Sequence, residues 1–172
     1  MMLTVPAQDD AVGINAGLLR AFEALHAAPE VRRSHHFEGR WENLYIARDL
    51  IPEIEPVLAT ALEHAGRLLG RADLRVGFWF NETHPGQRTL IHAHDDTDEL
   101  LSGVYYVTAP ENCGDLLIHH RDHIERIAPQ AGRFVFFPPD LPHEVEPHHG
   151  VGMRLSLAMN FGPRDGGEFS YD

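Results

Sequence analysis

The chain has 172 residues, of which 43% are hydrophobic and 23% charged, as in a folded domain with an apolar core. Its formal net charge of −12, with histidines counted as neutral, argues against nucleic acid or an anionic membrane as a partner. A single cysteine (Cys113) excludes an internal disulfide, residues 1–10 lack a secretory pattern and no segment has the length of a membrane span, so a cytoplasmic location is expected.

The first 70 residues have the apolar periodicity of helices. A short helix is indicated by apolar residues on one face, namely Ile14, Leu18, Leu19, Phe22 and Leu25. A longer helix is indicated by Ile54, Val57, Leu58, Ala61, Leu62, Ala65, Leu68 and Leu69. Pro52 and Pro56 suit its first turn, and Gly70 suits its C-terminal end. Between the helices, residues 32–50 are expected to be irregular or to include one short strand.

After Gly70 the pattern changes to short strands separated by turns rich in proline and glycine. Eight strands are predicted, at residues 74–81, 89–94, 101–109, 115–120, 123–128, 133–138, 143–147 and 153–161. Eight strands at this spacing favour a mainly β sandwich or jelly roll, with the two helices packed on one sheet. We therefore expect a single domain, 1–172, made of a helical lead (1–70) and a β core (71–172).

Two histidine motifs, far apart in the sequence, have the composition of one metal site. Side chains two residues apart on a strand share a face, so His92 and His94, or His94 and Asp96, can bind one ion together. His143 follows a proline-rich turn, where a stiff backbone can hold its imidazole. Three histidines, or two histidines and a carboxylate, would leave coordination positions open for a substrate and oxygen.

An arginine and a serine follow this motif on the last predicted strand. Arg154 comes eleven residues after His143, and Ser156 lies two residues further, on the same face of the strand. A guanidinium offers a planar fork to a carboxylate, and a hydroxyl can add a hydrogen bond. The pair therefore predicts an anchor for one carboxylate.

The remaining polar clusters are expected at the surface. These are the histidine pairs His35-His36, His119-His120 and His148-His149, and the acidic stretch Asp95, Asp96, Asp98 and Glu99. Cys113 lies in a turn without the local pattern of a nucleophile. The chain has no glycine-rich phosphate-binding motif and no Gly-x-Ser-x-Gly, and its basic residues form no stripe, so nucleic acid is set aside.

Residues 78–161 resemble the bacterial 2-oxoglutarate/Fe(II) oxygenases of the prolyl-hydroxylase-like superfamily. The resemblance covers about half of the chain in order. It is carried by Phe80-Asn81, Pro85-Gly86, His92-Ala93-His94, LSGVYYV (101–107), Ala109-Pro110-Glu111, Cys113-Gly114-Asp115-Leu116, GRFVFFP (132–138), Leu141-Pro142-His143, Arg154-Leu155-Ser156 and Asn160-Phe161.

The resemblance implies a double-stranded β-helix, the cupin-like jelly roll, with Fe(II) and 2-oxoglutarate as cofactors and O2 as co-substrate. It implies His92 and His143 as iron ligands, and Arg154 with Ser156 as the anchor of 2-oxoglutarate. Tyr106 matches a tyrosine that binds the same carboxylate in related prolyl hydroxylases.

Two sets of iron ligands remain possible. The acidic stretch at residues 95–99 makes the segment between His92-Ala93-His94 and the strand LSGVYYV longer than in the family, so the two motifs cannot both be aligned. The spacing from Pro85-Gly86 favours His92, His94 and His143, whereas the spacing to Tyr105 favours His94, Asp96 and His143. We expect the first set, and His94 belongs to both.

The expected function is an oxygenase that hydroxylates a peptide or protein side chain, or a small amino-acid-like molecule. One alternative is a cupin-like metal enzyme that does not use 2-oxoglutarate and has no need of Arg154. Another is a non-catalytic β-sandwich binding module. An exposed strand edge or the N-terminal helices could support a homodimer.

Overall fold

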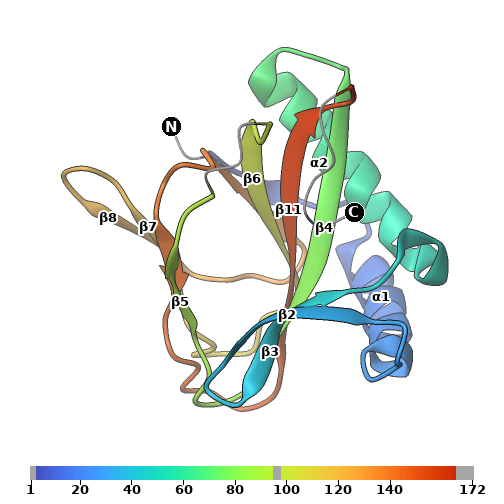
Figure 1. The fold of residues 1–172 in the computed structure, drawn as a ribbon, viewed down its shortest axis with the longest axis vertical. Helices are drawn as coiled ribbons and strands as arrows, with labels where there is room; N and C mark the ends of the chain where they lie inside the picture. The colour runs from blue at the N-terminus through green and yellow to red at the C-terminus, as the bar shows by residue number, and fades with distance from the viewer. Residues whose placement is uncertain (1–2, 95–97, 166–172) are drawn as a thin grey trace.

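A computed structural model describes residues 3–94 and 98–165, which form two antiparallel sheets and two α-helices (Figure 1). Asp96 lies outside the described residues. The elements are β1 (Leu3–Ala7), α1 (Ala11–Leu25), β2 (Arg32–Phe37), β3 (Arg40–Tyr45), the 3-10 helices η1 (Arg48–Leu50) and η2 (Pro52–Ile54), α2 (Glu55–Leu69), β4 (Leu74–Thr83), β5 (Thr89–His92), β6 (Leu101–Thr108), β7 (Leu116–His119), β8 (Ile124–Ile127), β9 (Arg133–Phe137), β10 (His143–Val145) and β11 (Arg154–Pro163).

The two sheets confirm the predicted mainly β jelly roll. The large sheet has the order β1-β9-β6-β11-β4-β3-β2, and the small sheet has the order β5-β10-β7-β8. Figure 1 shows α1 and α2 on the side of the large sheet that faces away from the small sheet. All eight strands predicted after Gly70 are present, and the N-terminal helices pack on one sheet as expected.

Two parts of the large sheet were not predicted. Strand β1 pairs with β9 at one edge of the sheet, where no strand was predicted. Residues 32–45, expected to be irregular or to hold one short strand, form the hairpin β2–β3, which joins the sheet through β4. Strands β1 and β3 pair with strands far away in the sequence, which local patterns do not reveal, whereas β2 pairs with its neighbour β3 in a hairpin that was missed.

The alternation of side chains along β11 divides the core from a cavity between the sheets. Leu155, Leu157 and Phe161 are fully buried in the apolar cluster that includes the helices. Arg154 and Ser156 point to the opposite face and line the cavity. Because the side-chain period of a strand is two residues, one strand serves both the core and the candidate site.

Helix α1 is held to the large sheet by aromatic packing and by a buried polar contact. The rings of Phe22 and Phe80 lie 5.0 Å apart between their centroids. The hydroxyl of Tyr105 donates to Oδ1 of Asn15 at 2.7 Å. Helix α2 ends at Gly70, whose φ of 66° is the left-handed conformation that glycine adopts at helix ends. Within the described ranges, no helix has the length and apolar character needed to cross a membrane.

Replacing Phe22 with alanine should lower the free energy of unfolding by about 3–5 kcal/mol, because it leaves a cavity between α1 and β4. The matched control is Val12→Ala on the same helix, where the side chain is 86% exposed. That change should stay within about 0.5 kcal/mol. Urea unfolding followed by circular dichroism measures both, and equal effects would show that α1 does not pack as described.

Candidate metal centre and cofactor pocket

A cavity of about 450 Å³ lies between the two sheets and contains the predicted site residues that the structure describes. Strands β4, β6 and β11 of the large sheet line one side, and β5 and β10 of the small sheet line the other. The predicted residues in its lining are His92, His94, Tyr106, His143, Arg154 and Ser156. The cavity therefore brings both halves of the predicted site together.

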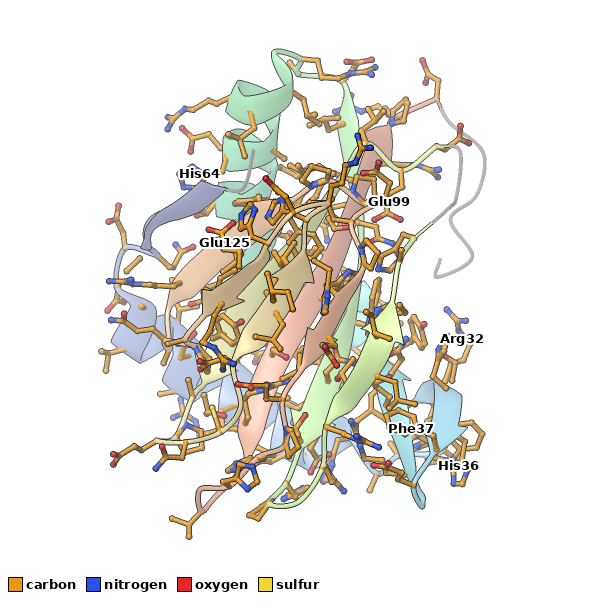
Figure 2. The ribbon with its side chains drawn as sticks, turned by 90° about the vertical axis from the view of Figure 1, so that its left-hand side faces the viewer. Arg32, His36, Phe37, His64, Glu99 and Glu125 are labelled. Atoms are coloured by element: carbon orange, nitrogen blue, oxygen red, sulfur yellow. The ribbon has the colours of Figure 1, made fainter. Side chains whose placement is uncertain are left out.

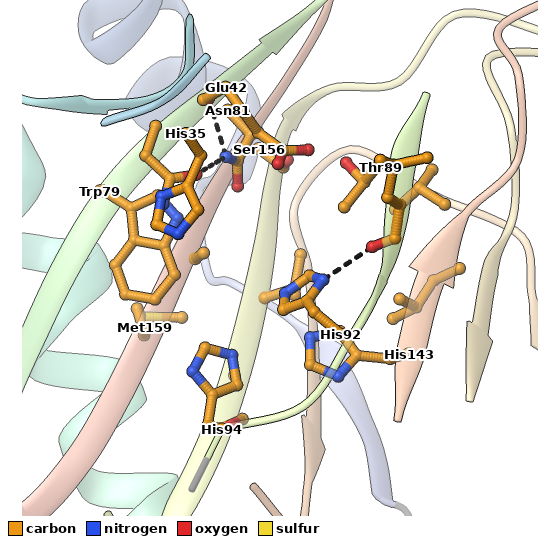
Figure 3. A pocket seen from close by; sticks show the side chains of 18 of the residues that line it. His35, Glu42, Trp79, Asn81, Thr89, His92, His94, His143, Ser156 and Met159 are labelled. Atoms are coloured by element: carbon orange, nitrogen blue, oxygen red, sulfur yellow. Dashed lines mark hydrogen bonds between the residues drawn. The ribbon is translucent and has the colours of Figure 1, made fainter. Parts of the chain in front are cut away.

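Three histidines converge at the small sheet, with their side chains directed toward one another (Figure 3). His92 on β5 and His143 on β10 are direct cross-strand partners, and their ring centroids are 4.3 Å apart. The ring of His94 lies 5.4 Å from that of His143. Each of the three offers one ligand atom, and these atoms all lie within 4.8 Å of one another. A single transition-metal ion can be bound by three nitrogens in such a group.

His94 reaches the cluster from a loop, because β5 ends at His92, two residues earlier than predicted. The N–H of His94 donates to the carbonyl of Pro139 at 3.0 Å, which fixes the backbone beyond the strand. The contact with the connection between β9 and β10 thus replaces the strand pairing expected here.

Backbone hydrogen bonds fix the proton on Nδ1 of two of these imidazoles. Nδ1 of His92 donates to the carbonyl of Leu90 at 2.8 Å, and Nδ1 of His143 donates to that of Leu141 at 2.9 Å. Because a carbonyl can only accept, Nε2 of each neutral ring keeps its lone pair for a metal. Burial, followed by the charge of His92, lowers the pKa of His143 to about 3, so this ring is neutral at physiological pH.

Glu99 was expected in a solvated acidic loop, and this expectation is wrong. The side chain of Glu99, labelled in Figure 2, is 0% exposed. One of its carboxylate oxygens lies 3.6 Å from Nδ1 of His94. The hydroxyl of Ser102 donates to the other oxygen at 2.6 Å. A carboxylate beside the outer nitrogen of a ligating histidine orients the ring and raises its basicity. Sequence alone gives Glu99 the same appearance as its exposed acidic neighbours.

Arg154 lies at another part of the cavity and is 2% exposed. Its Nη1 donates to the carbonyls of Cys113 at 3.4 Å and Gly114 at 3.3 Å. Its Nε is buried and has no hydrogen-bond partner, and among the described residues no carboxylate forms an ion pair with Arg154. Burial lowers the pKa of Arg154, since the cation loses its hydration. A buried cation with an unused donor is suited to an anionic ligand.

Position 114, whose carbonyl accepts a hydrogen bond from Arg154, requires glycine. Gly114 has a φ of +91°, and a Cβ atom there would lie 2.2 Å from the carbonyl oxygen of Glu146. Any side chain would push this turn away from the chain that precedes β11. The close approach keeps the carbonyl of Gly114 within reach of Arg154.

Tyr106 and Ser156 share the cavity wall with Arg154. They are cross-strand partners on β6 and β11, so their side chains project from the same face of the sheet. Burial raises the pKa of Tyr106 to about 12, so its hydroxyl stays protonated and can donate a hydrogen bond. The guanidinium and two hydroxyl groups form a donor set suited to one carboxylate.

One histidine expected at the surface is buried. His148 is 1% exposed, and its Nδ1 accepts a hydrogen bond from the N–H of Gly150 at 3.1 Å. Its neighbour His149 is exposed, as expected. His35 and His36, on β2, are also exposed as expected, and they line the mouth of the cavity. The expectation is therefore wrong at His148 alone of these four.

Comparison with known proteins identifies the family. The profile of the 2OG-Fe(II) oxygenase superfamily matches residues 78–162. A search of curated proteins gives no match. The chain belongs to the 2OG-Fe(II) oxygenase superfamily, and its cofactors are those of the family, iron and 2-oxoglutarate. This decides against the cupin-like enzyme without 2-oxoglutarate and against the non-catalytic module.

Solved structures show the same fold. A prolyl-4-hydroxylase of Pseudomonas putida is 22% identical, with a TM-score of 0.70 over 95% of this chain and 92% of that one. A Trichoplax adhaerens prolyl hydroxylase, in complex with a hypoxia inducible factor oxygen degradation domain peptide fragment, is 14% identical, with a TM-score of 0.72 over 94% and 83%. The epimerase SnoN from nogalamycin biosynthesis, in complex with Fe3+, alpha ketoglutarate and nogalamycin RO, is 17% identical, with a TM-score of 0.70 over 94% and 78%.

Replacing Glu99 with glutamine should weaken binding of Fe(II) by about 10- to 100-fold, because His94 loses the carboxylate beside its outer nitrogen. The matched control is Glu111→Gln, at an exposed position, which should leave the affinity unchanged. Anaerobic titration of metal-free protein with Fe(II) measures both. Equal affinities for the two variants would remove Glu99 from the site.

Proposed function

We propose that the chain is an Fe(II)- and 2-oxoglutarate-dependent hydroxylase in which His92, His94 and His143 hold the iron. The observation that carries this proposal is one cavity that contains three convergent imidazoles and a buried guanidinium with an unused donor. Imidazole nitrogens suit iron, and the guanidinium suits the distant carboxylate of a keto acid.

The donor set fits iron chemically. Nδ1 of His92 and of His143 is occupied by a carbonyl, so Nε2 of both rings can coordinate without a proton to displace. Three neutral imidazoles would not neutralise the positive charge of the iron. The buried carboxylate of Glu99, which lies beside His94, would neutralise part of that charge. The alternative ligand set, with Asp96 in place of His92, includes a residue outside the described part of the chain.

The other part of the cavity fits 2-oxoglutarate. We assign Arg154, Ser156 and Tyr106 to its distant carboxylate, which the guanidinium would bind through the unused Nε and the two hydroxyl groups by hydrogen bonds. The carbonyls of Cys113 and Gly114 hold the guanidinium in place before the anion arrives. Such preorganisation lowers the cost of ordering a side chain on binding.

Iron and 2-oxoglutarate, when bound, supply the oxidising chemistry with O2, and the protein supplies position and a shielded site. The cavity wall includes Trp79, Leu116 and Phe137, whose apolar surfaces limit the water beside the metal ligands. Tyr106 stays protonated, so it can serve as a donor without releasing charge into the site.

We further propose a substrate presented as a peptide or protein side chain, or as a small amino-acid-like molecule. The fold is that of a prolyl-4-hydroxylase and of a prolyl hydroxylase whose structure holds a peptide fragment. Leu90 and Ile91, which line the cavity from β5, are 45% and 54% exposed and offer an apolar rim to a ligand. The net charge of −12 favours a neutral or cationic substrate.

Two variants separate the proposed roles. Arg154→Ala should weaken 2-oxoglutarate binding on the order of 100-fold, from the loss of charge-assisted hydrogen bonds, while Fe(II) binding stays nearly intact. His143→Ala should abolish Fe(II) binding. Anaerobic calorimetry measures both ligands, with Arg67→Ala on the surface of α2 as the control. Full iron occupancy in His143→Ala, or equal loss of both ligands in Arg154→Ala, would contradict the assignment.

The hydroxylase reaction is tested with mass spectrometry. Protein with Fe(II), 2-oxoglutarate and O2 is incubated with a panel of proline-containing peptides and free amino acids. We expect one substrate to gain the mass of one oxygen atom, with one succinate formed per product. A product of unchanged mass, or one lighter by two hydrogen atoms, would show epimerisation or ring closure instead.

A further inference from the structure

A second group of side chains of the types that bind metals lies at the end of the β7–β8 hairpin and is separate from the three cavity histidines. The strands pair in register, with Ile118 opposite Glu125 and His119 opposite Ile124. The next pair is His120 and His123, where the N–H of His120 donates to the carbonyl of His123 at 2.9 Å. The turn between them is therefore two residues long and closed by a backbone hydrogen bond.

Hairpin geometry places three ligand side chains on one face. Residues opposite each other in an antiparallel pair project to the same side, and so do residues two apart on one strand. His120 therefore shares a face with His123, and His123 shares it with Glu125. Each of the three offers a donor atom, and these atoms lie within 4.8 Å of one another. The arrangement follows from the register of the backbone.

Ring stacking and hydrogen bonds within this group orient the imidazoles of His120 and His123. The imidazoles of His120 and His123 stack with centroids 4.4 Å apart and an angle of 4° between the ring planes. Nε2 of His120 donates to a carboxylate oxygen of Glu125 at 3.2 Å. Nδ1 of His123 donates to Asp122 at 2.9 Å, which leaves Nε2 of His123 with its lone pair.

We propose that His120, His123 and Glu125 form a second metal site, of the class that binds Zn(II). Two imidazole nitrogens and one carboxylate oxygen are ligands that zinc prefers, whereas calcium and magnesium prefer oxygen alone. An ion bound between His120 and Glu125 replaces their hydrogen bond, and the neutral ring of His120 then carries its proton on Nδ1 in place of Nε2. Asp122 orients His123 from its other nitrogen, as outer carboxylates do in zinc sites.

The site is accessible to ions from solvent. The exposed fractions of the side chains are 19% for His120, 60% for His123 and 36% for Glu125. A bound ion would link the ends of the two strands across the turn. Strand β7 also pairs with β10, where Ile118 lies opposite His143, so the site would stabilise a strand adjacent to the proposed iron ligand.

Zinc stoichiometry tests the proposal, with Zn(II) titrated into metal-free protein and followed by calorimetry. Because zinc also binds sites of the iron type, we expect two equivalents in the unmodified protein and one in His143→Ala. His123→Ala and Glu125→Gln should each lose one equivalent, and the His123→Ala/His143→Ala double variant should bind none. His149→Ala, at an exposed histidine outside the hairpin, should keep two.

The outcomes separate this site from the proposed iron centre. An equivalent that is lost in His123→Ala and unaffected by His143→Ala supports the hairpin site, even if the iron ligands are assigned wrongly. Unchanged stoichiometry in both His123→Ala and Glu125→Gln would overturn the hairpin site. Both changes are at partly exposed positions, so circular dichroism should show an unaltered fold.

Discussion

The pairing of β5 with β10 is the constraint on which the candidate site depends. It sets His92 directly opposite His143, although fifty-one positions separate them in the sequence. The two short strands place two of the proposed ligands, and the hydrogen bond from the N–H of His94 to the carbonyl of Pro139 places the third. Backbone hydrogen bonds thus set the convergence of the three imidazoles, so the iron site that we propose is preorganised.

Strand β11 contributes one face to the apolar core and the other face to the candidate site. Leu155 and Leu157 fill the core beneath the helices, whereas Arg154 and Ser156, which alternate with them along the strand, line the cavity on the opposite face. A buried cation without a carboxylate partner is costly to a fold. The carbonyls of Cys113 and Gly114 offset part of that cost, and a bound anion would offset more. The protein therefore keeps a destabilising group at the place where a carboxylate ligand is expected.

Local patterns in the sequence predicted what depends on near neighbours. Helical and strand periodicity located α1, α2 and the eight strands of the β core, and the two-residue spacing placed Arg154 and Ser156 on one face. The failures have two sources. Strand β1 and the β2–β3 hairpin join the large sheet through β9 and β4, which are far from them in the sequence. Glu99 contacts His94 and Ser102, which are near it in the sequence, but nothing in the sequence distinguishes it from its acidic neighbours.

The central claim is that one cavity binds iron through the three histidines and 2-oxoglutarate through Arg154. The most direct measurement is the visible absorption spectrum of metal-free protein under anaerobic conditions, recorded as Fe(II) and then 2-oxoglutarate are added. The account predicts a weak charge-transfer band that appears only when both are present, because the keto acid chelates iron held by the protein. Iron binding without that band would contradict the account at Arg154, and no iron binding would contradict it at the histidines.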